Sequence, residues 1–196
     1  VYADNAATTP VTPAVLEAMT PWLMENYGNP SSIYSIGRAA RTAVEKARRQ
    51  VAAALNAEPG EIYFTSCGTE ADNWALKGSM RRWAAKKKKH LITAAFEHHA
   101  ILHSAKALEK EGFEVTYLPV TPEGLVDPAE LEKAIREDTA LVSIMLANNE
   151  IGTIQDIALL ARLAHEAGAL FHTDAVQAVG KIPVDVESLG VDYLTM

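Results

Sequence analysis

Residues 141–174 read LVSIMLANNEIGTIQDIALLARLAHEAGALFHTD. The stretch opens with an almost unbroken apolar run at 141–146 and continues through an amphipathic segment at 157–167. It closes with a segment at 169–173 whose first three residues are apolar. Apolar runs on either side of a helix are typical of parallel strands that are buried on both faces of their sheet. This stretch therefore predicts a strand–helix–strand unit of an α/β fold.

The same alternation extends through most of the chain. Capping residues followed by proline mark two helix starts, at Thr12-Pro13 and at Asp127-Pro128. We expect a mainly parallel sheet with helices on both faces, in one open, doubly wound architecture. The further predicted strands are 61–65, 91–95, 113–118 and 191–196, and the further predicted helices are 13–24, 37–55, 69–85, 98–111 and 128–136.

Composition narrows the class of protein. The chain has 196 residues, of which 48% are apolar and 22% charged, so it can bury a core. Its net charge of −7 argues against a broad surface for nucleic acid or anionic membranes, and no run approaches the ~18 apolar residues of a membrane span. The single Cys67 excludes an internal disulfide and a cysteine-based zinc ribbon. We expect a soluble, cytoplasmic protein.

The two ends of the sequence suggest a fragment. The chain begins with Val1 rather than Met, and residues 191–196 read as a strand in progress. We therefore expect that further residues belong to this protein.

Polar residues gather where the predicted strands end. In open α/β sheets, ligands bind at the carboxyl ends of the strands. The loops at 66–70, 96–99, 147–152 and 174–177 leave those ends and hold most of the unusual polar residues. A ligand site is expected there.

The first of these loops opens a helix. Gly68 and Thr69 lie in a small, hydroxyl-rich turn, where unpaired backbone N–H groups and the helix dipole could hold a phosphate. An ordinary N-cap would satisfy the same pattern. The spacing excludes a Walker loop and a Rossmann dinucleotide fingerprint.

The end of the last complete predicted strand and the loop after it carry His172, Asp174 and Gln177. His172 and Asp174 are two residues apart and point to one face. An aspartate in a buried position needs a cation or several donors, and the protonated nitrogen of a pyridine cofactor is one such partner. An iron site and a simple cap of the next turn are the alternatives.

The remaining loops offer histidines and amides. His99 and His103 are spaced for a shared zinc ion, although no third ligand is evident, and a histidine after a strand could instead cover a cofactor ring. The loop at 148–152 places Asn149 beside a turn in which we expect Gly152 to have a positive φ. Together the four loops suit a phosphorylated aromatic cofactor.

Six segments, in order along the chain, resemble the amino-terminal half of the cysteine desulfurases, the NifS/IscS group of pyridoxal-phosphate enzymes. They read DNAATTP at 4–10, GNPSS at 28–32, FTSCGTE at 64–70, EHHA at 97–100, ANNEIGT at 147–153 and HTDAVQ at 172–177. The resemblance implies the large domain of a fold-type I enzyme at 15–196, incomplete, with 1–14 packing against a small domain.

The resemblance also implies a role for each site residue. Gly68 and Thr69 would bind the cofactor phosphate, and His98 would stack on the ring and assist proton transfer. Asp174 would hold the ring nitrogen protonated, while Gln177 and Asn149 would lie near the phenolic oxygen. Cys67 matches a family position that does not accept sulfur. No metal is expected.

As a whole enzyme, such a protein would convert L-cysteine to L-alanine and an enzyme persulfide for iron–sulfur cluster assembly. The resemblance implies a homodimer that passes sulfur to a scaffold or other acceptor protein. The Schiff-base lysine and the persulfide cysteine lie outside this sequence, so we expect the 196-residue chain alone to be inactive. The alternatives are a selenocysteine or cystine lyase, a non-catalytic binding partner and a metal-dependent oxygenase.

Overall fold

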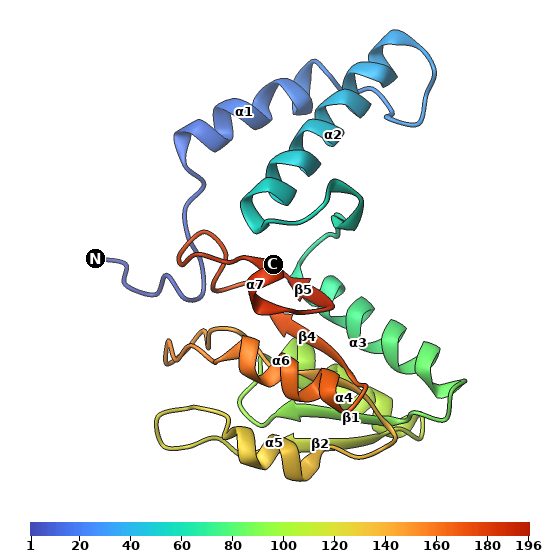
Figure 1. Ribbon diagram of the computed structural model, residues 1–196. Coiled ribbons are helices and arrows are strands. Elements are labelled where there is room, and N and C mark those ends of the chain that lie inside the picture. Colours follow the sequence, from blue (N-terminus) through green and yellow to red (C-terminus); the bar gives the residue numbers. More distant parts are fainter. The chain divides into compact units, whose positions relative to one another are not determined.

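The computed structural model describes residues 1–196 and divides them into two compact units (Figure 1). The first unit is Val1–Tyr63 and the second is Phe64–Met196. From the resemblance we expect residues 1–14 to pack against a small domain and residues 15–196 to form the large domain. This division stays a prediction.

The first unit is helical. Helix α1 (Pro13–Met24) begins after Thr12, whose hydroxyl accepts a hydrogen bond from the Val15 N–H. Helix α2 (Ser35–Leu55) buries only a narrow stripe of small and apolar residues and ends where Asn56 takes a left-handed conformation. A short 3₁₀ helix, η1 (Pro59–Glu61), follows. Both predicted helices are confirmed, with α2 starting two residues early.

The second unit is built on one five-stranded sheet in which every strand pair is parallel. Its strand order is β2-β1-β3-β4-β5. The strands are β1 (His90–Ala94), β2 (Glu114–Leu118), β3 (Thr139–Ser143), β4 (Leu170–Asp174) and β5 (Tyr193–Thr195).

Helices cover both faces of this sheet, as predicted (Figure 1). Helices α3 (Gly68–Ala84) and α4 (His99–Lys110) pack against each other on one face, while α5 (Pro128–Ala134) and α6 (Ile157–Glu166) pair on the other. The short α7 (Val186–Leu189), which the sequence did not predict, contacts α6. None of these helices combines the length and the apolar character that a membrane-spanning helix requires.

The core lies between the sheet and its helices. All residues of β1 and β3 are buried, which explains their continuous apolar runs. Side chains of α3 and α4 pack against these two strands in one apolar cluster that includes Leu76, Met80, Leu91, Ile101 and Leu141. The loops at the ends of the central strands are thereby held on a rigid base.

The predicted strand at 61–65 is wrong. Glu61 ends η1, and none of the five strands includes a residue of this segment. A strand needs a hydrogen-bonded neighbour, and no strand of the sheet pairs with these residues. Tyr63 and Phe64 are residue types typical of a buried strand, but in the structure both side chains are exposed.

Candidate cofactor site

Because all five strands are parallel, their carboxyl ends form a single edge of the sheet. A Cβ atom added at Gly68 would lie 2.8 Å from Val176 Cγ2, so the start of α3 packs closely against the loop that follows β4. Two of the four predicted loops therefore meet in the structure.

Gly68 and Thr69 form the first turn of α3. Cys67 occupies the N-cap position and makes no side-chain capping hydrogen bond. Ser66 directs both its N–H and its hydroxyl to Glu70 Oε2, at 2.6 and 2.7 Å. The turn is therefore not an ordinary N-cap, and the helix start with the exposed Thr69 suits an anion such as a phosphate.

His98 is the N-cap of α4. Its Nδ1 accepts a hydrogen bond from the Ala100 N–H at 3.2 Å. Since Nδ1 is an acceptor, the proton of a neutral ring lies on Nε2. The contact fixes both the orientation and the tautomer of His98.

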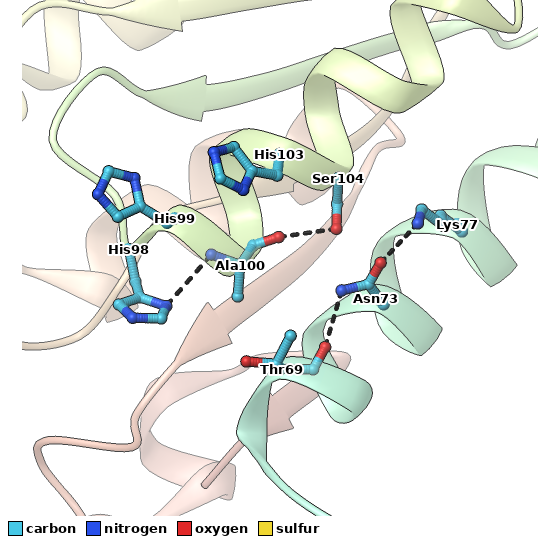
Figure 2. Close-up of a pocket in the computed structure, with 8 residues that line it drawn as sticks. All are labelled: Thr69, Asn73, Lys77, His98, His99, Ala100, His103 and Ser104. Atoms are coloured by element: carbon cyan, nitrogen blue, oxygen red, sulfur yellow. Dashed lines mark hydrogen bonds between the residues drawn. The ribbon is translucent and has the colours of Figure 1, made fainter.

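His98 and Thr69 line one pocket between α3 and α4, with a volume of about 280 Å³ (Figure 2). On the α3 side, Lys77 Nζ donates to Asn73 Oδ1 at 2.6 Å, and Asn73 Nδ2 donates to the Thr69 carbonyl at 2.8 Å. The pocket thus joins two of the residues predicted to hold the cofactor.

The two other histidines of this pocket lie side by side. The rings of His99 and His103 stack with their centroids 5.4 Å apart (Figure 2). The structure holds no group of three or more His, Cys, Asp or Glu side chains arranged for a metal ion. The zinc alternative therefore has no third ligand in this structure.

Asp174 ends β4 and is 5% exposed. Its Oδ1 accepts a hydrogen bond from the Val176 N–H at 3.0 Å. Burial raises the pKa of this carboxyl, while the Val176 N–H and the nearby His98 lower it. A cationic group such as a protonated ring nitrogen would stabilise the charge of Asp174 here.

His172 has a structural position. Its Nδ1 lies 2.9 Å from Ser143 Oγ and its Nε2 lies 3.0 Å from Thr195 Oγ1. The side chain is completely buried, which lowers its pKa to about 3. Because both ring nitrogens are already hydrogen-bonded, the iron-site interpretation of His172 and Asp174 is wrong.

Gln177 lies on the turn after β4. Its Oε1 accepts a hydrogen bond from Lys181 Nζ, a contact that the sequence did not predict. The NH₂ group of a side-chain amide is its donor, so this is the part of Gln177 that would donate to a phenolic oxygen.

The loop after β3 is organised by Asn148. Its Oδ1 accepts from the N–H groups of Glu150 and Ile151, and its Nδ2 donates to the Phe96 carbonyl at 3.0 Å. Gly152 has a φ of +74°, as the sequence predicted. Asn148 holds the loop that carries Asn149, which is half-buried.

Two buried carboxyls were missed by the sequence analysis. Asp72 is 1% exposed on α3, and Glu97, 5% exposed, accepts a hydrogen bond from the Met145 N–H at 2.9 Å. A signal for Asp72 was present, because it precedes Leu76 by four residues and Met80 by eight, the spacing of one helix face. Glu97 had no comparable signal.

The structure thus gathers most of the predicted site. Thr69 and His98 share a pocket, His98 acts electrostatically on Asp174, and Gly68 lies against the loop that carries Gln177. Asn149 lies on the neighbouring loop. The roles of these residues toward a cofactor stay predictions.

Comparison with known proteins shows the family. A family model described as "Aminotransferase class-V" matches residues 1–196. The chain belongs to this family. Together with the relatives and solved structures described next, this match confirms the predicted family, its pyridoxal-phosphate cofactor class and the expected fold.

Relatives and solved structures agree with this assignment. A protein of Methanosarcina thermophila named cysteine desulfurase IscS is 57% identical over the whole chain, which covers 48% of that relative. A solved structure titled "NIFS-LIKE PROTEIN" is 48% identical with a TM-score of 0.96, over 99% of this chain and 54% of that one. Another, "SspA in complex with cysteine", is 40% identical with a TM-score of 0.94, over 99% and 56%. The chain spans about half the length of the curated relatives it matches.

Proposed function

We propose that this chain forms the cofactor-binding half of a cysteine desulfurase, which uses pyridoxal phosphate to remove sulfur from L-cysteine and leaves L-alanine. Support comes from relatives named cysteine desulfurase at 57% and 56% identity and from a similar structure titled as a complex with cysteine. The carbon–sulfur bond of cysteine breaks, the sulfur passes to an enzyme cysteine as a persulfide, and a proton takes its place on alanine.

The observation that carries this proposal is the buried Asp174 at the carboxyl end of β4. A carboxyl that is 5% exposed is costly to ionise without a cation, and its pKa is raised by burial. Bound pyridoxal phosphate supplies an electron sink whose ring nitrogen is most effective when it carries a proton. Asp174 would hold that proton.

The other residues would bind and orient the cofactor. The first turn of α3, at Gly68 and Thr69, offers backbone N–H groups and a hydroxyl to the phosphate. The Gln177 amide would donate to the phenolic oxygen, with Asn149 close to it. Each of these groups lies at the carboxyl edge of the same sheet.

His98 would cover the ring and move a proton. The Ala100 N–H occupies its Nδ1, so Nε2 is the atom that would give or take the proton. The electrostatic link between His98 and Asp174 fits a position of His98 close to the bound ring.

The wider setting of the enzyme also belongs to this proposal. We expect a cytoplasmic homodimer whose persulfide sulfur is passed to an iron–sulfur scaffold or another acceptor protein. The support for the sulfur-transfer role is the IscS name that several relatives carry.

The test uses the full-length protein that carries this sequence. Asp174→Asn should reduce alanine release from cysteine by roughly 100-fold, because the ring nitrogen loses the carboxylate that holds its proton. The cofactor should still bind through its phosphate, as measured by absorbance. Glu132→Gln, on the exposed face of α5, is the matched control. Unchanged alanine release in Asp174→Asn would refute the proposal.

A further inference from the structure

Asp72 is a buried carboxyl that the proposed mechanism does not use. It lies on α3, which packs against β3, β4 and β5. Its Oδ1 is buried without a hydrogen-bond partner and lies 3.7 Å from the Nε2 atom of His172. That distance is too long for a hydrogen bond, so the two side chains are neighbours without a direct bond.

The groups around Asp72 provide no cation to balance a negative charge. From β4, His172 is neutral because burial lowers its pKa to about 3, and Asp174 repels a second carboxylate. Glu97, on the loop after β1, is a third buried carboxyl and interacts unfavourably with both Asp72 and Asp174. His98 favours the negative charge of Asp174, but it is not among the groups that act on Asp72.

Thr195 connects Asp72 to the cofactor site. Its hydroxyl lies 3.0 Å from His172 Nε2, the same ring nitrogen that lies 3.7 Å from Asp72 Oδ1. In the sheet, Thr195 is the direct register partner of Asp174, and its carbonyl accepts a hydrogen bond from the Ala175 N–H at 2.7 Å. Asp72 is therefore linked to the end of β4 through the neighbouring Thr195 and His172.

We infer that Asp72 is a positioning residue of the cofactor site, which as a neutral acid holds Thr195 against β4 and keeps a second negative charge away from Asp174. The inference rests on the proposed function, because it assigns Asp174 to the ring nitrogen. A neutral Asp72 explains how its carboxyl can be buried close to those of Asp174 and Glu97 with no cation beside it. Burial and the charge of Asp174 raise the pKa of Asp72 to about 7, although the Thr195 side chain lowers it, so the neutral acid predominates below that pH.

The first measurement is the protonation state of His172 by side-chain ¹⁵N NMR at pH 6, in the full-length apoprotein. In the wild type and in Asp72→Asn, His172 should be a neutral imidazole. An imidazolium in the wild type that becomes neutral in Asp72→Asn would show a buried ion pair and would overturn the inference.

The second measurement is the thermal stability of the apoprotein against pH. A carboxyl whose pKa is raised on folding is protonated in the folded state at pH values where the unfolded chain has already ionised. Its contribution to stability is therefore greatest at low pH and is lost as the pH rises from about 4 to about 7. Asp72→Asn lacks this loss, so its Tm relative to the wild type should increase between pH 5 and pH 8, whereas Glu132→Gln should show no such trend. A lower Tm for Asp72→Asn at pH 8 than for the wild type would contradict a neutral Asp72.

The third measurement tests positioning, through the affinity for pyridoxal phosphate. Asp72→Ala should weaken binding about tenfold, the effect of one lost hydrogen bond, and Asp72→Asn should restore it to within about threefold. Thr195→Val removes the hydroxyl with little change in shape and should weaken binding similarly, even if Asp72→Ala fails to fold. Wild-type affinity in Thr195→Val would refute the link. If the wild type itself binds no pyridoxal phosphate, the proposed function and the positioning role both fail, while the first two measurements still report the state of Asp72.

Discussion

Glu97 shows how a single residue can join two loops of the site. Its Oε1 accepts the Met145 N–H, which ties the end of β1 to the end of β3, and its Oε2 is buried without a partner. Burial raises the pKa of Glu97 well above its usual value, and the neighbouring Asp174 and Asp72 raise it further. Glu97 precedes His98 directly, so its position also sets that of the histidine.

The substitution Glu97→Gln should preserve this tie. The new amide keeps an oxygen for the Met145 N–H and has no charge to bury. Because the folded-state pKa of Glu97 is raised, its contribution to stability is greatest at low pH and is lost as the pH rises above the unfolded pKa. We expect the Tm of Glu97→Gln to exceed that of the wild type by more at pH 8 than at pH 5. A thermal scan in which the variant is less stable at pH 8 would show that the carboxylate itself is needed.

Gly68 is required by close packing rather than by backbone conformation. A Cβ at this position would lie 2.8 Å from Val176 Cγ2, on the loop that carries Asp174 and Gln177. Gly68→Ala should therefore displace that loop, with a cost in stability of about 1–3 kcal/mol and weaker cofactor binding.

The matched control for Gly68→Ala is a second substitution at Val176, its neighbour in space. Val176→Ala removes the obstructing methyl group, so the double variant should recover most of the stability and affinity lost in Gly68→Ala. Denaturant unfolding and cofactor titration measure both. A double variant as impaired as Gly68→Ala would mean that the Val176 contact is not the cause.

At the scale of elements, the loop after β3 is held by one amide side chain. Asn148 both accepts and donates hydrogen bonds, and its donor group reaches the Phe96 carbonyl on the loop after β1. A side-chain amide supplies both kinds of contact, whereas an ionised carboxylate can only accept. The loop that carries Asn149 therefore depends on Asn148, a residue that we do not place in contact with the cofactor.

Asn148→Asp tests this dependence. Aspartate keeps the acceptors for Glu150 and Ile151 but cannot donate to Phe96, and it places a charge at a buried position. The free energy of unfolding at pH 7 should fall by about 2–3 kcal/mol, with weaker cofactor binding. Asn149→Asp, one residue further on, should affect stability less. Equal losses from the two substitutions, measured by denaturant unfolding, would place the organising role elsewhere.

At the scale of the molecule, the two units differ in how much they bury. Helix α1 has no buried residue, and its large apolar side chains, including Leu16, Trp22 and Leu23, are exposed. The second unit, in contrast, has a well-formed core. The residues that the resemblance assigns to the Schiff base and to sulfur acceptance are not among these 196.

The 196-residue chain expressed by itself should therefore bind pyridoxal phosphate only weakly and release no alanine from L-cysteine. The full-length protein, assayed in parallel, is the positive control. Alanine formation by the purified chain, free of any longer form, would contradict this prediction and would require another residue to bind the cofactor covalently.

Much of the fold could be predicted because its signals are local. The apolar runs of β1, β3 and β4 and the caps at Thr12 and Asp127 depend on residues close in sequence, and these elements are confirmed. The strand predicted at 61–65 was wrong because its pattern is local, whereas a strand exists only beside a hydrogen-bonded neighbour. The predicted strand at 141–146 differs from β3, which spans Thr139–Ser143. Ile144 and Leu146 still donate hydrogen bonds to β4 carbonyls, but they lie beyond the regular ladder, which a local pattern does not reveal.

The order of the amino acids was sufficient to predict the fold class, the family and the loops in which the candidate cofactor residues lie. The folded structure was needed to place Asp72 and Glu97 near Asp174, to show His172 held by two hydroxyls and to identify the free ring nitrogen of His98. The physical reason is that backbone periodicity and capping act over a few residues, whereas the charge of a buried group depends on neighbours that come from distant parts of the chain.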